Sequence, residues 1–370
     1  MLTFFLIAGG LMMTTNPAGG AAVKDRPAPP FWLDCTVRGE SVLFVAPTAG
    51  GPPAATLWFP PVKVLSVRNA AGTVTYAEGR DYVLAPGGRL TLPAGSAIPA
   101  KTAAELTPPK GSQPYGLVRR DGAGDILFGA SHEYHDAQAQ VTYTRARDAW
   151  RGPAPILGRE GLAPLRATLK RGGELRVAVF GDSISTGCNA SKWAGVAPLQ
   201  PAYPELVAGA VEAAYGGRVA LTNFAVGGMT SSWGVGHVAP VAESKPDLVI
   251  LAWGMNDANA PGLPPAQFAA NLEAQIAAIR KVNPDAAFVL VAPMLPNEMW
   301  RVVVPGLIEQ YRDAMRPLCG AGVALADLSA VWRRMVDRKN YLDITGNGVN
   351  HPNDFGHRLY AETIGALLLP

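Results

Sequence analysis

The chain has 370 residues, of which 48% are hydrophobic and only 16% are charged. A chain of this length usually forms more than one hydrophobic core, so two domains are expected. Its 32 basic and 29 acidic residues give a net charge of +3, and no basic run carries interleaved aromatic side chains, which excludes nucleic acid as an expected partner. The 41 glycines and 33 prolines favour a turn-rich, partly β-structured protein over a helical bundle.

The first 22 residues have the pattern of a signal peptide. An apolar segment at 2–13 is followed by small residues that end at Ala22, where cleavage is expected. Such a leader would direct the protein to the periplasm or out of the cell. No lysine or arginine precedes the apolar segment, which is atypical, and a buried or frayed N-terminus is the alternative. No later stretch reaches the roughly 20 apolar residues that a membrane span requires.

Residues 23–150 alternate between short β-type runs and turns rich in glycine and proline. The runs occupy 41–45, 56–59, 62–67, 89–92 and 139–143. This alternation predicts an antiparallel β-sandwich or jelly-roll domain over residues 23–150. The proline-containing segment 151–173 is expected to be a linker between two domains.

Residues 174–370 alternate between apolar β-type runs and helical stretches, which predicts an α/β domain with a parallel sheet and helices on both faces. The expected strands are 175–180, 219–223, 247–253, 287–291 and 323–326. The clearest helices are 203–215, 265–282, 307–318 and 354–367. Such a sheet binds ligands beyond the carboxyl ends of its strands.

The first of these strands stops abruptly at Gly181-Asp182-Ser183. A tight turn at this edge presents a side chain to the ligand crevice, and Ser183 is the residue placed there. A serine hydroxyl is a weak nucleophile, so Ser183 requires a base and hydrogen-bond donors for an oxyanion. The alternative for Ser183 is a helix N-cap, and Asp182 is expected to brace the turn.

Donors for an oxyanion follow the next two strands. The loop after 219–223 contains Gly228, whose backbone N–H can approach a ligand closely, and Gly227 is the alternative. The loop after 247–253 contains Asn256, a neutral side-chain amide. With the N–H of Ser183, these groups form the predicted oxyanion hole of Ser183, Gly228 and Asn256.

The base is expected from the last loop, where two histidines compete. His351 precedes Pro352, which disfavours helical geometry and should hold His351 on a loop at the sheet edge. His357 falls within the last predicted helix, where a solvated or capping role is commoner. An imidazole suits general-base work because its ordinary pKa is near neutrality.

Together these blocks resemble those of the SGNH hydrolases, also called the GDSL esterase/lipase family, over residues 175–368. The blocks are Gly181-Asp182-Ser183, Gly228, Gly254-Met255-Asn256-Asp257 and His351-Pro352. The resemblance implies a flavodoxin-like three-layer parallel sheet, with Ser183 as nucleophile, His351 as base, and Gly228 and Asn256 in the oxyanion hole. A β-domain before an SGNH domain is also similar to the arrangement in some carbohydrate esterases.

The chain departs from the family at the acid of the triad. Three residues before His351 the family has an aspartate, whereas this chain has Gly348. The open alternatives are a dyad steered by a backbone carbonyl or Asn347, a distant acid such as Asp354 or Asp343, and a literal Asp354-x-x-His357 pair. A missing acid need not abolish turnover, because its role is to fix the imidazole tautomer and stabilise the imidazolium.

A second cluster, His132-Glu133-Tyr134-His135-Asp136, has the side chains of a metal site but not the spacing of the zinc-protease motif. In a β-rich region, residues three apart point to opposite faces, so no metal is expected there. A structural role, or a contact with the second domain, is the favoured interpretation.

The sequence thus predicts a serine ester hydrolase that needs no cofactor. The resemblance makes short acyl esters of carbohydrates, above all O-acetyl esters, the first substrate class, either as small molecules or as polysaccharides. A lipase, arylesterase or thioesterase of the same family is one alternative. The absent aspartate motivates another, an inactive carbohydrate-binding protein. The oligomeric state and the role of the β-domain are not predicted.

Overall fold

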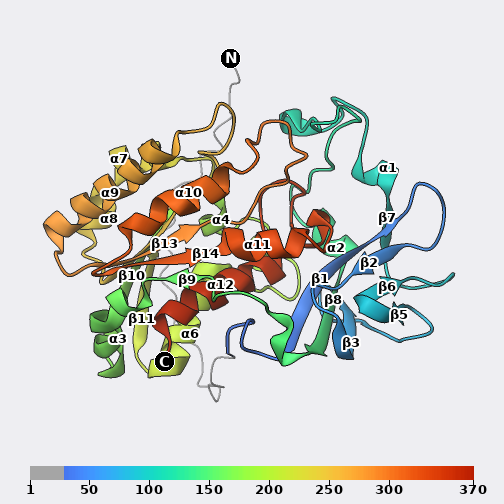
Figure 1. Ribbon diagram of the computed structural model, residues 1–370, viewed down its shortest axis with the longest axis horizontal. Helices are drawn as coiled ribbons and strands as arrows, with labels where there is room; N and C mark the ends of the chain where they lie inside the picture. The colour runs from blue at the N-terminus through green and yellow to red at the C-terminus, as the bar shows by residue number, and fades with distance from the viewer. Residues whose placement is uncertain (1–28) are drawn as a thin grey trace.

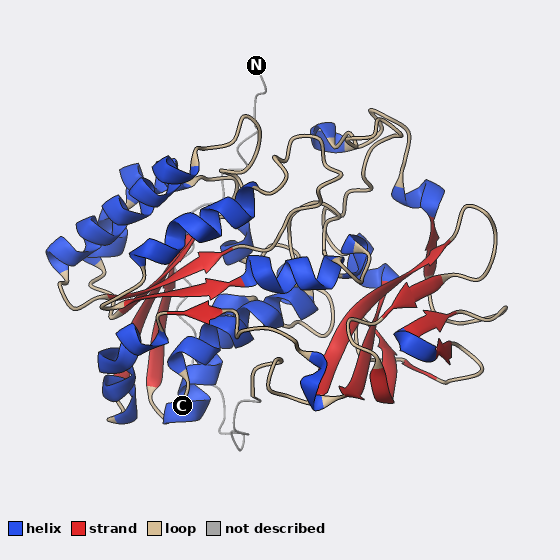
Figure 2. Ribbon diagram, in the orientation of Figure 1, coloured by secondary structure: helices blue, strands red, loops and turns tan. Residues whose placement is uncertain are grey.

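The computed structural model describes residues 29–370, so the expected signal peptide at 1–22 lies outside the described residues. Figures 1 and 2 show a β-rich domain formed by the first part of the chain and an α/β domain formed by the rest. The arrowheads of β13 and β14 point toward the β-rich domain, so the carboxyl ends of these strands lie near the junction of the two domains. Among the described residues, no helix is long and apolar enough to cross a membrane.

The N-terminal domain contains a connected sheet with the strand order β4-β3-β8-β1-β2-β6-β5, and β7 pairs with β1 outside this path. The strands are β1 (Thr36–Ala46), β2 (Ala54–Thr56), β3 (Pro61–Asn69), β4 (Thr75–Tyr76), β5 (Val83–Ala85), β6 (Arg89–Thr91), β7 (Ala100–Thr102) and β8 (Gln138–Arg145). Short helical turns in the connections are η1 (Pro86–Gly88), α1 (Ala103–Leu106), η2 (Pro114–Gly116), α2 (Glu133–Ala137) and η3 (Arg147–Ala149).

The β-rich character expected for this domain is confirmed, but the strands form one curled sheet rather than the two sheets of a sandwich or jelly roll. The reason lies in β1, which changes partners along its length. Its first part pairs antiparallel with β8, whereas Phe44–Ala46 pairs in parallel with β7. A register shift between Val37 and Glu40 marks an irregularity in the pairing with β8, and such bulges bend a strand.

The segment 151–173, expected to be a linker, contributes elements to the α/β domain. It contains β9 (Ile156–Leu157), η4 (Arg159–Leu162) and α3 (Ala163–Lys170). Strand β9 pairs antiparallel with β14 and so adds an edge strand to the second sheet. The short apolar pair in β9 gave too weak a pattern to be predicted as a strand.

The second sheet has the strand order β11-β10-β12-β13-β14-β9, and the neighbours from β11 to β14 pair in parallel. Its strands are β10 (Glu174–Gly181), β11 (Arg218–Asn223), β12 (Leu248–Ala252), β13 (Ala287–Ala292) and β14 (Val323–Asp327). The helical elements are α4 (Ser183–Thr186), α5 (Ser191–Ala194), α6 (Tyr203–Tyr215), α7 (Ser231–His237), α8 (Ala239–Glu243), α9 (Pro265–Val282), α10 (Leu307–Met315), η5 (Arg316–Leu318), α11 (Leu328–Val336), η6 (Tyr341–Asp343) and α12 (Asp354–Leu368).

Strands β12 and β13 are buried along their whole length, which explains their continuous apolar sequences. Helices α7 to α10 pack among themselves on one side of the sheet in Figure 1, and α6 packs on α12 on the other side. One apolar cluster includes side chains of both domains, for example Phe44 and Val141 in the N-terminal domain and Ile250 and Leu290 in the α/β domain.

A buried ionic cluster also joins the domains. The Nζ atom of Lys339 lies 2.6 Å from Oε1 of Glu40 on β1 and 3.2 Å from Oδ2 of Asp343 on η6. Oδ1 of Asp343 accepts a hydrogen bond from the N–H of Leu43 at 2.8 Å. Because the Lys339 and Glu40 side chains are fully withdrawn from solvent, these contacts hold β1 directly against the segment that precedes α12.

Candidate active site

Ser183 is the first residue of α4 and follows β10 at the carboxyl edge of the sheet. Asp182 caps this short helix, because its Oδ1 atom accepts a hydrogen bond from the N–H of Ile184 at 3.0 Å. Gly181 suits the turn, since a Cβ atom there would lie 2.5 Å from the carbonyl oxygen of Ala252. The capping role considered for Ser183 therefore falls to Asp182, and the Ser183 hydroxyl is left for another contact.

The Oγ atom of Ser183 lies 2.8 Å from Nε2 of His351. His351 stands on the loop between η6 and α12, and Asn347 shapes this loop. The Oδ1 atom of Asn347 accepts hydrogen bonds from the N–H groups of residues 349, 350 and 351 at 2.9–3.0 Å. The fold thus brings the predicted nucleophile and base together, whereas Asn347 shapes the loop and does not contact the imidazole ring.

The other nitrogen of the His351 ring contacts a residue that sequence analysis missed. Nδ1 of His351 lies 2.8 Å from Oδ1 of Asn189, on the loop between α4 and α5. Asn189 has a φ of 63°, a conformation that asparagine adopts more readily than most residues. Its place six residues after Ser183 is a weak sequence signal, because the contact depends on how the loop after α4 returns toward the last loop.

None of the three predicted alternatives for the orienting group is placed beside Nδ1 of His351. Oδ1 of Asp354 accepts a hydrogen bond from the N–H of Ser191 at 2.8 Å, and Asp343 belongs to the ionic cluster with Lys339. These assignments are corrected: both carboxylates hold the backbone of other segments. The side-chain amide of Asn189 lies beside Nδ1 of His351, where an acid or a backbone carbonyl was expected.

His357 is a structural histidine. Its Nδ1 atom accepts a hydrogen bond from the N–H of Tyr203 at 3.4 Å, and Nε2 lies 3.3 Å from the carbonyl oxygen of Cys188. The ring is fully buried and stacks against the ring of Tyr203. The literal Asp354-x-x-His357 pattern therefore does not supply the partner of Ser183.

The predicted oxyanion donors lie on loops that meet beside Ser183. The backbone N–H of Ser183 is at the first position of α4, where a helix leaves its N–H groups without intrahelical acceptors. A Cβ atom at Gly227 would lie 3.7 Å from Cβ of Ser183, which shows how closely this loop passes the nucleophile. Its neighbour Gly228 has a φ of 79°, the left-handed conformation that glycine adopts without strain.

Asn256 is held next to this glycine loop. Its Nδ2 atom donates a hydrogen bond to the carbonyl oxygen of Met229 at 2.9 Å, which uses one of its two N–H bonds. Asp257 joins the same loops, because its carboxylate accepts hydrogen bonds from the N–H of Ser231 and the N–H of Gly254. The second N–H bond of Asn256 is therefore available on a side chain whose position is already fixed.

Burial dominates the electrostatics around the pair. It lowers the pKa of His351 to about 3, and the neighbouring His357 acts in the same direction. It lowers the pKa of His357 to about 4 and raises the pKa of Asp182 to about 7. Because the group at Nδ1 of His351 is a neutral amide, no contacting carboxylate raises the pKa of this imidazole. His351 is thus a neutral ring that can accept the Ser183 proton.

The cluster at 132–136 lies at the start of α2, with His132 at the N-cap, rather than in extended structure, which corrects the argument from strand geometry. His132 and Asp136 are one helical turn apart, with Nδ1 2.7 Å from Oδ2. The predicted contact with the second domain is confirmed, since Nε2 of His135 lies 2.8 Å from the carbonyl oxygen of Ala197. Within residues 29–370, no group of three or more His, Cys, Asp or Glu side chains gathers as a metal site would require.

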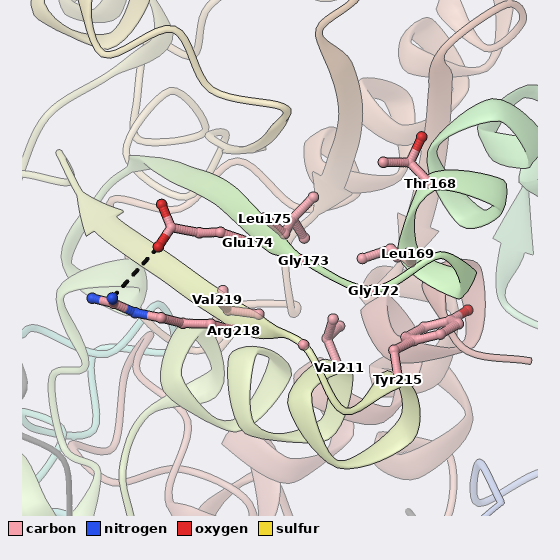
Figure 3. Close-up of a pocket in the computed structure, with 11 residues that line it drawn as sticks. Thr168, Leu169, Gly172, Gly173, Glu174, Leu175, Val211, Tyr215, Arg218 and Val219 are labelled. Atoms are coloured by element: carbon pink, nitrogen blue, oxygen red, sulfur yellow. Dashed lines mark ion pairs between the residues drawn. The ribbon is translucent and has the colours of Figure 1, made fainter.

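Figure 3 shows a small pocket that is separate from the Ser183–His351 pair. It lies at the amino ends of β10 and β11, the edge of the sheet opposite to Ser183, where Glu174 and Arg218 form an ion pair at 3.5 Å. Its lining includes Leu169 and Tyr215 but none of the predicted site residues. This pocket is not the candidate active site.

Residues 179–359 match the model of the GDSL-like lipase/acylhydrolase family. Among solved structures, a two-domain esterase active on acetylated mannans matches with a TM-score of 0.44 and 22% identity over 56% of this chain and 52% of that chain. An acetyl xylan esterase from Geobacillus stearothermophilus matches with a TM-score of 0.42 and 18% identity over 53% of this chain and 95% of that chain. No curated protein matches the sequence.

The C-terminal domain therefore belongs to the GDSL-like lipase/acylhydrolase family. The predicted family and enzyme class, a carboxylic ester hydrolase of the SGNH type, are confirmed at the level of the family. The chain spans about half the length of the two-domain esterase that it matches in structure.

Proposed function

We propose that this protein hydrolyses carboxylic esters through an acyl-enzyme on Ser183, with His351 as the general base. The observation that carries the proposal is the 2.8 Å contact between Oγ of Ser183 and Nε2 of His351. A serine gains nucleophilicity when an adjacent base can take its proton as it attacks. The position of Ser183 supports the proposal, since it follows β10 at the carboxyl edge of parallel strands, where α/β sheets bind ligands.

In the first half of the reaction, Oγ of Ser183 attacks the ester carbonyl carbon while its proton moves to Nε2 of His351. The carbonyl oxygen becomes an oxyanion in the tetrahedral intermediate. When the intermediate collapses, the bond to the alkoxy oxygen breaks, and the leaving alcohol takes the proton from Nε2. The products of this step are the free alcohol and an acyl ester of Ser183.

In the second half, a water molecule attacks the acyl carbon and gives its proton to Nε2 of His351. The second tetrahedral intermediate collapses with departure of Oγ, which takes the proton back from Nε2. The carboxylic acid is released and Ser183 is regenerated. No electron acceptor or further reactant enters this cycle, and its atoms balance as ester plus water giving alcohol plus acid.

We assign the oxyanion hole to the N–H of Ser183, the N–H of Gly228 and the side-chain amide of Asn256. The support is their arrangement: the glycine loop passes Ser183 closely, and Asn256 is fixed on that loop by Met229. Donors held in place before the charge develops stabilise the transition state without reorganisation.

As substrates we propose short-chain acyl esters of carbohydrates, above all O-acetyl esters. Ser183 is only 8% exposed, and the residues placed beside it are a glycine, Gly227, and the polar His351. These surroundings suit a small acyl group and a hydroxylated alcohol better than a long acyl chain. A two-domain esterase active on acetylated mannans is among the similar structures.

A lipase, arylesterase or thioesterase is the second candidate. The observation that favours it is the exposed Val226, on the glycine loop beside the oxyanion donors, which offers apolar contact to a longer acyl group. The third candidate, an inactive carbohydrate-binding protein, rests on the glycine at position 348. The Ser183–His351 contact argues against it.

Rates on p-nitrophenyl esters from acetate to palmitate test the substrate class, with Ser183→Ala as the control for background hydrolysis. The proposal requires the highest kcat/KM on acetate and loss of activity in Ser183→Ala. A preference for palmitate would instead assign the enzyme to the lipase class. Failure of Ser183 to react with an organophosphonate probe would indicate an inactive protein.

We further propose a periplasmic or secreted location, supported by the pattern of residues 1–22.

A further inference from the structure

The side chain of Asn189 is fixed by contacts on both ends of its amide. Oδ1 lies 2.8 Å from Nδ1 of His351. Nδ2 lies 3.1 Å from the carbonyl oxygen of Ser131, 3.2 Å from that of Gly346 and 3.4 Å from that of Gly129. Asn189 is 8% exposed, so water does not compete freely for these contacts.

These contacts determine which way the amide points. Carbonyl oxygens only accept hydrogen bonds, so the group that faces Gly129, Ser131 and Gly346 must be the NH2 donor. The amide oxygen then faces His351 and can only accept, so the Nδ1 atom of His351 must carry the proton. Nε2 is left without a proton and is the acceptor for the Ser183 hydroxyl, which is the tautomer that a general base requires.

Two of these carbonyl groups belong to the N-terminal domain, in the segment between β7 and β8. This segment is itself held against the loop that carries His351. The N–H of Gly129 donates to the carbonyl oxygen of Asn347 at 3.1 Å. The hydroxyl of Tyr134 donates to the carbonyl oxygen of Leu127 at 2.9 Å, and a Cβ atom at Gly348 would lie 2.6 Å from that hydroxyl oxygen.

We propose that Asn189 is the positioning residue of the catalytic relay, and that the N-terminal domain completes the active site by holding the Asn189 amide through the carbonyl groups of Gly129 and Ser131. This inference rests on the proposed function of the Ser183–His351 pair. Asn189 acts through His351 by fixing its tautomer and ring orientation. The relay is then Ser183, His351 and Asn189, with an amide in the place of a carboxylate.

The carbonyl groups also explain why an amide suits this position better than a carboxylate. An aspartate at 189 would turn an oxygen toward the carbonyl oxygens of Gly129, Ser131 and Gly346, where the amide now donates hydrogen bonds. Those acceptors would lose their donor, and two negatively polarised groups would face each other in a buried site. The asparagine is therefore matched to its surroundings on both domains.

Other titratable groups on the elements around His351 must be considered when a pH profile is interpreted. They are Asp182 and Cys188 beside the nucleophile, Asp354 and His357 on α12, Tyr341 on η6, Glu133, Tyr134 and His135 on α2, and His132 just before α2. All of these remain in a variant that changes only residue 189. A change in the acid limb between parent and variant therefore reports on the contact of residue 189 with His351.

The first test replaces Asn189 by glycine and by aspartate in the full chain, and measures p-nitrophenyl acetate hydrolysis. Glycine accepts the positive φ of this position, so Asn189→Gly removes the amide without backbone strain. We expect kcat to fall roughly 10- to 100-fold with little change in KM. We expect the acid limb of kcat/KM to move to higher pH in Asn189→Asp, because a carboxylate stabilises the protonated imidazole.

The control is Asn283→Ala, which should keep the parent kcat and acid limb. The amide of Asn283 donates to the carbonyl oxygen of Pro246, far along the chain from the site.

A second readout separates positioning from folding. The ¹⁵N spectrum of histidine-labelled protein reports the tautomer directly, and the parent should show Nδ1 protonated and Nε2 unprotonated for His351 at neutral pH. Asn189→Gly should show a mixture of tautomers while its thermal unfolding remains cooperative. An unchanged tautomer, or an acid limb that does not move in Asn189→Asp, would overturn the inference even if Asn189→Gly were less active.

The domain contribution is tested by Gly129→Ala, with Gly209→Ala on α6 as the matched control. A Cβ atom at Gly129 would lie 2.8 Å from the carbonyl oxygen of Gly346, whereas nothing lies within 4 Å of one at Gly209. Gly129→Ala should lower kcat and disturb the His351 tautomer, and Gly209→Ala should do neither. A parent-like kcat and tautomer in Gly129→Ala would refute the role of the N-terminal domain. Activity retained in Ser183→Ala would refute the proposed function instead, so the two failures are distinguishable.

Discussion

His351 donates its Nδ1 proton to the amide oxygen of Asn189, 2.8 Å away, in the position where related hydrolases are expected to place a carboxylate. The interaction is between a ring and a neutral group, so it orients the imidazole without adding negative charge beside it. The chemistry of the base then depends mainly on burial, and the pKa of His351 is lowered to about 3. The pH dependence of catalysis follows from this relationship.

The activity of the parent enzyme should persist well into the acid range. A general base works only when unprotonated, so kcat/KM falls when the pH drops below the pKa of His351. Because that pKa is lowered from 6.5 to about 3, kcat/KM should stay level from neutral pH to about pH 4. Initial rates on an acetyl ester check this, over a pH range in which circular dichroism shows the folded protein. An acid limb with its midpoint between pH 6 and 7 would contradict it.

Replacing the nucleophile or the base should abolish turnover. In Ser183→Ala and His351→Ala, we expect kcat to fall at least about 10⁴-fold, because members of one relay act as a unit. The double variant should be no less active than either single variant, within the background rate. Steady-state rates of all three proteins and their thermal unfolding provide the measurement. A double variant with an additional large loss would mean that the two residues act independently.

The placement of His351 on a loop could be predicted from the sequence, but the partner of its Nδ1 atom could not. Pro352 restricts the backbone at His351, and this local rule was enough to place the residue on a loop. The strands could likewise be located from their apolar runs, since β12 and β13 are buried on both faces. Asn189 has no such local signature. Its role depends on the loop after α4 and on carbonyl groups of Gly129 and Ser131, which come from the other domain.

Long-range pairing also limits what the sequence predicts for the N-terminal domain. Alternating runs identify strands but not their partners, so a sandwich and a curled sheet give the same pattern. The exchange of partners along β1, from β8 to β7, distinguishes the two arrangements, and it is a long-range feature.

Asp343 and Asp354 show the same dependence on long-range contacts at the site. Both are acids near His351 in sequence, yet each is engaged by the backbone or side chains of other segments.

Asn256 should contribute to the transition state rather than to substrate binding. Its amide is the one side-chain donor of the proposed oxyanion hole, and removing such a donor lowers kcat about 10²- to 10³-fold. Asn256→Ala should therefore show this loss with little change in KM for an acetyl ester. The variant also frees the carbonyl oxygen of Met229, so its thermal unfolding should be compared with that of Asn283→Ala. A rise in KM at constant kcat would assign Asn256 to substrate binding instead.

The ionic cluster between the domains should be important for stability. Lys339 is fully buried between Glu40 and Asp343, so Lys339→Met would leave two buried carboxylates without their cation. Breaking a buried pair in this way costs about 3–5 kcal/mol of the free energy of unfolding. Lys192→Met is the matched control, because Lys192 pairs with Glu205 at 2.9 Å on the surface, where such a pair contributes about 1 kcal/mol or less.

Urea unfolding of both variants measures the difference in the free energy of unfolding. Because Asp343 also accepts the N–H of Leu43, loosening this cluster should disturb β1 and the segment before α12 together. Equal stability of the two variants would show that the cluster does not join the domains energetically.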